Sequence, residues 1–287
     1  MGSEMCELLG MECNVPTDIV FSFTALSMRG GRTAHHSDGW GLALYQGRFA
    51  QVFLEPRPAC EGPLAGFMRD NPIRTLLAVA HVRKMTVGAQ SLENTHPFKR
   101  VCWGRDWVFA HNGTLPAVKE KPVGDFAPVG DTDSEHAFCW MLNQLRAAFP
   151  GGYPEDRPAD LWKCVAELGG QLGAEGTCNF LLADGRHLFA RCATKLAFII
   201  RRAPFGRATL SDADVAVDFS ALTTPNDRVA VVATTPLTRD EPWTVGVPGT
   251  LWVFRQGELA ATLTSCDPAG RPERPMPADP ALAGAGV

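Results

Sequence analysis

The sequence predicts a mixed α+β fold whose strands are mainly antiparallel. Apolar runs of strand length meet at tight turns, the clearest being Gln46-Gly47-Arg48 and Asp184-Gly185, and such turns are typical of β-hairpins. The chain shows neither the regular strand–helix–strand alternation nor the glycine-rich phosphate loop of a parallel nucleotide-binding sheet. Its 287 residues, 45% of them hydrophobic, can bury a core as one large domain or two small ones.

Helices and strands are mixed in the first two thirds of the chain. Apolar residues recur at helical spacing between residues 17 and 28, behind Pro16, and predict a helix that Thr17 or Asp18 caps and Arg29-Gly30-Gly31 ends. Further helices are expected at residues 61–71, 131–149 and 160–172. Strands are expected at residues 40–45, 49–54, 76–82 and 107–110, the first two forming a hairpin.

The β-structure dominates from Cys178 onward. Strands are expected at residues 180–183, 187–191, 196–201, 229–234 and 251–254, with another turn at Gln256-Gly257. From Ser265 the chain is rich in Pro, Ala and Gly, which predicts a disordered tail over residues 266–287. We therefore expect a single domain over residues 6–265, preceded by residues 1–5 as a leader or as residues added by cloning.

Composition and charge disfavour several classes of function. A net charge of −4 supplies no basic surface for nucleic acid. No apolar run approaches the roughly 18 residues of a membrane span, and the N-terminus lacks a secretion signal, so we expect a cytoplasmic protein without membrane or nucleic-acid partners. The nine cysteines include no C-x-x-C pair, which disfavours a disulfide framework or a zinc site and fits a reducing cytoplasm.

Cys6, which precedes an apolar run, is the candidate nucleophile. If maturation removes Met5 and everything before it, Cys6 carries a free α-amine beside its thiol. The thiol can then attack an electrophile, and the amine, with an ordinary pKa of about 7.7–8.0 against about 8.5 for the thiol, can accept the proton. The alternative is a buried cysteine on an N-terminal strand. Residues 1–4 would block the amine, so the hypothesis requires their removal.

Four polar segments follow or precede predicted elements. His35-His36 and Asp38 could suggest a metal, but no third ligand lies at a useful spacing, so no metal is expected. Arg83 ends a predicted strand, where its guanidinium could bind a carboxylate in bidentate fashion or form a surface salt bridge.

The other two segments are His111-Asn112-Gly113 and residues 130–135. An Asn amide beside a Gly N–H can face one oxygen as an oxyanion hole, although Asn-Gly is foremost a turn. Thr132 or Asp131 could cap the following helix, with Glu135 completing a capping box. Alternatively, Asp133 binds a substrate ammonium group.

Taken jointly, six motifs resemble the class II glutamine amidotransferases of the N-terminal-nucleophile hydrolase superfamily, and among them the stand-alone YafJ-type members. The motifs are Met5-Cys6-Glu7-Leu8-Leu9-Gly10-Met11, His36-Ser37-Asp38-Gly39-Trp40-Gly41, His81-Val82-Arg83, Glu93-Asn94-Thr95-His96-Pro97-Phe98, His111-Asn112-Gly113 and Thr132-Asp133-Ser134-Glu135. The resemblance implies a four-layer αββα sandwich of two antiparallel sheets, with Cys6 at the start of a central strand.

The resemblance also implies a reaction. Cys6 would attack the γ-amide carbon of glutamine with its own amine as general base, and the Asn112 side chain and Gly113 N–H would stabilise the oxyanion. Ammonia would leave, a γ-glutamyl thioester would form, and water would release glutamate. No cofactor is implied, and the ammonia would be released or passed to a separate ammonia-accepting subunit.

Substrate binding falls to other residues in the same resemblance. Arg83, assisted by Thr86, would bind the α-carboxylate of glutamine, and Asp133 its α-ammonium group. Asp38 and Gly39 match a family motif near the nucleophile but have no assigned step. Glu93 and His96 are interpreted as holding a loop. Many family members follow the arginine with Trp-Ala-Thr-His-Gly, which Lys84-Met85-Thr86-Val87-Gly88 replaces here.

Three alternatives stay open. A γ-glutamyl hydrolase would use the same Arg83 and Asp133 contacts on a γ-glutamyl peptide or thiol conjugate, with Tyr45, Trp103 or Trp107 lining a pocket for the leaving group. A non-catalytic glutamine-binding or scaffold subunit would keep residues 1–4 in place. A metallohydrolase would use His35, His36 and Asp38. The sequence does not define the oligomeric state.

Overall fold

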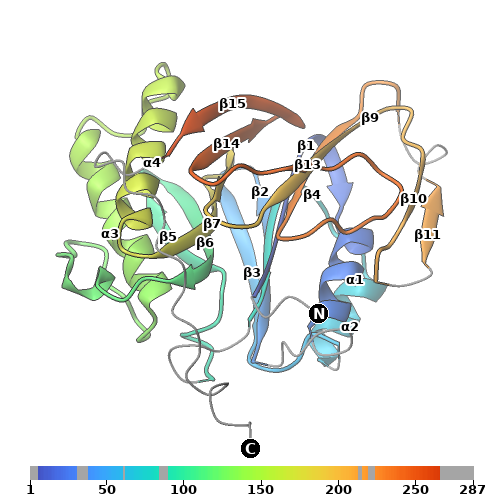
Figure 1. The fold of residues 1–287 in the computed structure, drawn as a ribbon, viewed down its shortest axis with the longest axis horizontal. Helices are drawn as coiled ribbons and strands as arrows, with labels where there is room; N and C mark the ends of the chain where they lie inside the picture. The colour runs from blue at the N-terminus through green and yellow to red at the C-terminus, as the bar shows by residue number, and fades with distance from the viewer. Residues whose placement is uncertain are drawn as a thin grey trace, which may run out of the picture.

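The computed structural model describes residues 6–30, 38–60, 62–83, 90–212, 215–218 and 224–265. In these ranges two antiparallel sheets pack face to face between two helical layers (Figure 1). Helices α3 (Asp133–Ala148) and α4 (Pro158–Gly173) cover one sheet, and α1 (Val20–Arg29) and α2 (Pro63–Asp70) cover the other. The predicted four-layer αββα sandwich is confirmed. The leader and tail predicted at residues 1–5 and 266–287 lie outside the described residues.

The first sheet has seven strands and places β1 (Glu7–Asp18) at its centre. Its order is β13-β9-β12-β1-β4-β2-β3, so β1 pairs with β12 (Arg228–Ala233) on one edge and β4 (Arg74–Val82) on the other. The remaining strands are β2 (Trp40–Gln46), β3 (Phe49–Glu55), β9 (Ala197–Arg202) and β13 (Thr244–Val245). Because both edges of β1 are paired, the chain beside Cys6 is held firmly.

The second sheet has six strands in the order β15-β14-β8-β7-β6-β5. They are β5 (Phe98–Cys102), β6 (Arg105–Thr114), β7 (Thr177–Ala183), β8 (Leu188–Cys192), β14 (Thr250–Arg255) and β15 (Glu258–Thr264). A separate small pair, β10 (Arg207–Thr209) and β11 (Ala216–Asp218), and a 3₁₀ turn at Val118–Glu120 complete the described elements. The turns predicted at Gly47, Gly185 and Gly257 join β2 to β3, β7 to β8 and β14 to β15, as expected.

The predicted start of the first helix is wrong. Thr17 and Asp18 still belong to β1, where they pair with Thr75 and Arg74 of β4, and α1 begins only at Val20. The sheet pairing outcompetes the capping signal, although the Asp18 carboxylate still accepts a hydrogen bond from the Val20 N–H at 3.2 Å. The predicted end at Gly30 is confirmed. No helix in the described ranges is long and apolar enough to cross a membrane.

The Asn112-Gly113 pair does not form a turn. Both residues lie inside β6, where Asn112 pairs with Asn179 and Gly113 with Cys178 of β7. The turn preference of Asn-Gly is a local tendency, and the ladder with β7 overrides it. The predicted strand at residues 107–110 therefore extends through the candidate oxyanion residues to Thr114.

Three apolar layers hold the sandwich together. One lies between α3, α4 and the second sheet, one between α1, α2 and the first sheet, and one between the two sheets. Strand residues alternate between these layers, as in β1, where Leu8 faces the other sheet and Leu9 faces the helices. This alternation decides which polar side chains meet at the ends of the strands.

A buried carboxylate, Glu12 of β1, predicts a pH dependence of stability. It accepts hydrogen bonds from the Gln256 and Gly257 N–H groups at 2.7 and 2.6 Å and is 5% exposed. Burial, which outweighs these two donors, raises its pKa from 4.5 to about 7. The folded state therefore keeps a proton that the unfolded chain loses above about pH 4.5, so this group's contribution to the free energy of unfolding falls by about 3 kcal/mol between pH 4.5 and 7.

Denaturant unfolding across this pH range tests the expectation. In Glu12→Gln the fall in the free energy of unfolding should be smaller than in the unchanged chain. Some fall should remain, because burial also raises the pKa of Glu7 to about 7. An equal fall in both proteins would contradict the assignment.

Candidate active site

Cys6 lies directly before β1 and is half-buried. In the β1–β4 register Glu7 pairs with Val82 and Leu8 with His81, so Cys6 directly precedes and Arg83 directly follows the last pair of the ladder. The β1–β12 pairing brings Thr234 to the same place, because its N–H donates to the Leu8 carbonyl and its hydroxyl accepts from the Leu8 N–H at 2.8 Å. The start of the central strand therefore meets the ends of both neighbouring strands.

A buried ion pair anchors this start of β1 from the helical side. Glu7, 2% exposed, accepts a hydrogen bond from the Arg29 guanidinium at 3.1 Å. Arg29 also donates to Asp212 and to the backbone carbonyls of Thr235 and Pro236. One buried guanidinium thus ties the residue after Cys6 to the segment that follows β12.

Asn112 of β6 reaches Cys6 from the second sheet. Its Nδ2 group donates to the Cys6 carbonyl oxygen and, at 3.2 Å, to the Thr234 hydroxyl. Its Oδ1 atom lies 2.9 Å from the His81 Nε2 atom. Asn112 shares the inter-sheet face of β6 with Val108 and Ala110, which explains why its amide points at β1 and β4.

Three buried histidines lie in this part of the molecule, and burial lowers the pKa of each. Burial lowers the pKa of His81 to about 3 and that of His96 well below its usual range, and it also lowers the pKa of His111. The His81 and His96 rings lie 4.3 Å apart between centroids, and His111 Nδ1 lies 2.8 Å from the Ser134 hydroxyl. Neutral imidazoles keep the site free of extra positive charge beside Arg83.

Gly113 occupies a conformation that only glycine adopts readily. Its φ angle is +147°, and a Cβ atom placed there would lie 1.8 Å from the Thr177 carbonyl oxygen. This close approach of β7 fixes the backbone beside Asn112. The oxyanion role of the Gly113 N–H stays a prediction.

Asp133 opens helix α3 and is 8% exposed. Its carboxylate accepts from the Leu115 N–H at 2.7 Å and from the Ser134 N–H at 2.8 Å, so it is fixed against the end of β6. Thr132 is the N-cap, as one alternative expected, and its hydroxyl accepts from the Glu135 N–H at 3.1 Å. Glu135 instead bonds to the Gly130 N–H and to Arg100.

Arg83 and Asp38-Gly39 lie side by side. The Arg83 N–H donates to the Gly39 carbonyl at 2.8 Å, the Asp38 N–H donates to the Arg83 carbonyl at 3.3 Å, and Arg83 is 4% exposed. Gly39 has a φ angle of +130°. The structure thus brings Cys6, Arg83, Asn112 and Asp38-Gly39 together and joins Asp133 to them through β6. Thr86, His35 and His36 lie outside the described residues.

The aromatic residues suggested for a leaving-group pocket do not surround this site. Tyr45 is buried between the sheets with its hydroxyl on the Asp106 and Ala183 carbonyls, and Trp107 is fully buried in the core. Trp103 lies in the turn between β5 and β6, next to the first residue of β6, whereas Asn112 lies near the other end of that strand. His96 is buried and Glu93 is exposed, so only His96 can hold the loop by packing.

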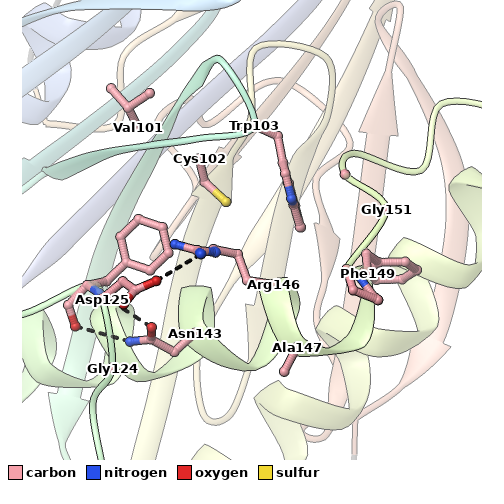
Figure 2. A pocket seen from close by; sticks show the side chains of 13 residues that line it. Val101, Cys102, Trp103, Gly124, Asp125, Asn143, Arg146, Ala147, Phe149 and Gly151 are labelled. Atoms are coloured by element: carbon pink, nitrogen blue, oxygen red, sulfur yellow. Dashed lines mark hydrogen bonds and ion pairs between the residues drawn. The ribbon is translucent and has the colours of Figure 1, made fainter.

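Trp103 instead lines an open pocket of about 800 Å³ (Figure 2). The pocket lies between the β5–β6 turn and the C-terminal part of α3, where Arg146 pairs with Asp125 at 2.8 Å. Arg146 and Asp133 are separated along α3 by about 20 Å. This pocket is therefore remote from Cys6.

Two polar residues of the site have no clear signal in the sequence. Thr234 ends a predicted apolar strand, and His81 occurs only within the His81-Val82-Arg83 motif. His81 contacts Asn112 from β4, and Thr234 contacts it from the residue directly after β12. The alternation of β4 could have placed His81 on the same face as Leu77 and Val79, but nothing local indicates the partner strand.

The family model and the related proteins that match this chain point to the same family. The model of the family described as glutamine amidotransferases class-II matches residues 5–278. The Escherichia coli (strain K12) protein named "Putative glutamine amidotransferase YafJ" is 50% identical over 254 residues, which cover 88% of this chain and 99% of that protein.

Two solved structures have the same fold as this chain. The crystal structure of a predicted glutamine amidotransferase from Pseudomonas aeruginosa has a TM-score of 0.71 and 42% identity, covering 89% of this chain and all of that one. The glutamine phosphoribosylpyrophosphate amidotransferase of B. subtilis has a TM-score of 0.56 at 14% identity, covering 91% of this chain and 49% of that one, and shares the fold. The chain belongs to the class II glutamine amidotransferase family.

Proposed function

We propose that this protein hydrolyses the γ-amide of glutamine with Cys6 as the nucleophile. The observation that carries the proposal is the contact between the two sheets at Cys6, where the Asn112 amide donates to the Cys6 carbonyl beside Arg83. A nucleophile at the end of a rigid central strand, next to an amide donor and a guanidinium, has the parts that acyl transfer from an amino acid requires.

The proposed reaction begins once Cys6 carries a free α-amine. The amine accepts the thiol proton as sulfur attacks the amide carbon, and the resulting oxyanion is stabilised by the Asn112 Nδ2 group and the Gly113 N–H. In the structure the second Nδ2 hydrogen bond, to the Thr234 hydroxyl, is 3.2 Å long, and it is this contact that the oxyanion would replace. The proton then passes to the departing ammonia, and water cleaves the γ-glutamyl thioester to glutamate.

Two charged residues are proposed to hold the amino-acid end of the substrate. The Arg83 guanidinium, assisted by Thr86, binds the α-carboxylate, and a bidentate pair of this kind is among the stronger hydrogen-bonded contacts. The Asp133 carboxylate, at the first turn of α3, binds the α-ammonium group. Asp38 and Gly39 support Arg83 through the backbone contacts described above.

The test compares two substrates and two forms of the chain. A chain expressed from Met5, whose processing exposes Cys6, is given glutamine or glutathione, and glutamate and ammonia are measured. We expect release from glutamine, and no release from the chain that retains residues 1–5. Glutamate release from glutathione alone would replace the proposal with γ-glutamyl hydrolysis, and activity of the unprocessed chain would remove the role of the α-amine.

A further inference from the structure

His81 and Asn112 form a buried contact between the two sheets. His81 is on β4 and Asn112 on β6, they are 1% and 2% exposed, and 2.9 Å separates Nε2 from Oδ1. Within the described residues no hydrogen-bond partner lies near His81 Nδ1. The imidazole makes its side-chain contact through Nε2, with Asn112, and the His111 backbone also lies close enough to affect its pKa.

The contacts of Asn112 determine which way its amide faces. The Cys6 carbonyl oxygen can only accept, so the Nδ2 group must face it. The Oδ1 atom consequently faces His81 and can only accept as well. His81 must carry its proton on Nε2, because the opposite tautomer would place two acceptors 2.9 Å apart.

We infer that His81 is a positioning residue that fixes the orientation of the Asn112 amide, and through it the donor offered to the reacting carbonyl oxygen. The inference rests on the proposed function. Without the His81 Nε2–H group, the amide oxygen loses this buried donor, and only the contacts of Nδ2 with the Cys6 carbonyl and the Thr234 hydroxyl still hold the amide in this orientation. A flipped amide would direct Oδ1 at Cys6 and could not stabilise an oxyanion.

An acid–base role for His81 does not fit its surroundings. Burial lowers its pKa to about 3, and Arg83 and His111 act in the same direction. The neighbouring His96 ring contributes only packing, with a centroid separation of 4.3 Å. The ring therefore stays neutral at the pH of catalysis and acts through one fixed N–H group.

A pair of variants separates positioning from packing. Gln and Met have similar length and shape, but only Gln carries an N–H donor near the position of Nε2. We expect His81→Met to lower kcat for glutamine by about 10- to 100-fold with KM changed less than about threefold, and His81→Gln to recover most of this loss. Equal activity of the two variants, or a loss confined to KM, would overturn the inference.

A second measurement does not depend on activity. In ¹⁵N-labelled protein the His81 ring, identified as the signal missing from His81→Gln, should show the neutral Nε2–H tautomer and no titration above about pH 5. An Nδ1–H tautomer or a titration near neutral pH would overturn the inference even in a fully active enzyme. Absence of glutaminase activity in the processed chain, with the Nε2–H tautomer observed, would overturn the proposed function and leave the orientation of Asn112 established.

Discussion

Replacing Cys6 with alanine is expected to lower the rate of glutamine hydrolysis by about 10⁴-fold or more. The change removes the nucleophile and leaves the contacts of its backbone carbonyl with Asn112 in place. Because Cys6 is only half-buried, the free energy of unfolding should change by less than about 1 kcal/mol. Steady-state ammonia release and denaturant unfolding measure the two quantities on the same preparation.

Cys164→Ala is the matched control. Cys164 is also half-buried, lies on α4, and belongs to the layer on the far side of the second sheet. Its replacement should leave the rate of ammonia release within twofold of the unchanged chain. A Cys6→Ala protein that keeps more than a tenth of the activity would exclude Cys6 as the nucleophile.

Replacing Asn112 with alanine is expected to lower kcat by about 100- to 1000-fold, the usual cost of losing one oxyanion donor. The change also removes the contacts with Thr234 and Cys6 and leaves the buried His81 Nε2–H without its partner, so some stability is lost. Activity must therefore be expressed per folded molecule, with the folded fraction taken from denaturant unfolding.

Asn179→Ala provides the comparison for this loss of stability. Asn179 of β7 lies opposite Asn112 and is 1% exposed. Its side chain bonds to the Thr194 hydroxyl, the Ala193 N–H and, at 3.3 Å, the Asn112 backbone carbonyl, so its loss weakens the same ladder without removing the Asn112 amide. We expect it to destabilise the fold to a similar extent but to lower kcat less than tenfold. If both variants lose activity equally per folded molecule, the effect of Asn112 is structural and its oxyanion role is wrong.

The parts of the fold that local chemistry determines were predictable from the sequence. The turns at Gly47, Gly185 and Gly257 carry residues that tolerate positive φ, and each joins two strands as expected. The edge strand β13 has two residues and was not predicted, because so short a strand has no periodicity of its own.

The errors in the sequence predictions have a common physical cause. At Thr17-Asp18 and at Asn112-Gly113 a local signal for a cap or a turn competes with pairing to a strand distant in the sequence, and pairing prevails. The same separation along the sequence explains why the contacts of the site could be predicted only in part. Arg83 and Asn112 could be proposed from their motifs, whereas the contact of Asn112 with His81 and Thr234 requires knowing that the two sheets face each other.

Covalent labelling tests the central claim most directly. The processed chain is incubated with a glutamine-like electrophile such as a diazoketone analogue, and modified peptides are mapped by mass spectrometry. The account predicts one adduct, on Cys6, and none on the other eight cysteines, of which Cys13 and Cys178 have a pKa that burial raises to about 12. An adduct on any of those cysteines with Cys6 unmodified would contradict the account.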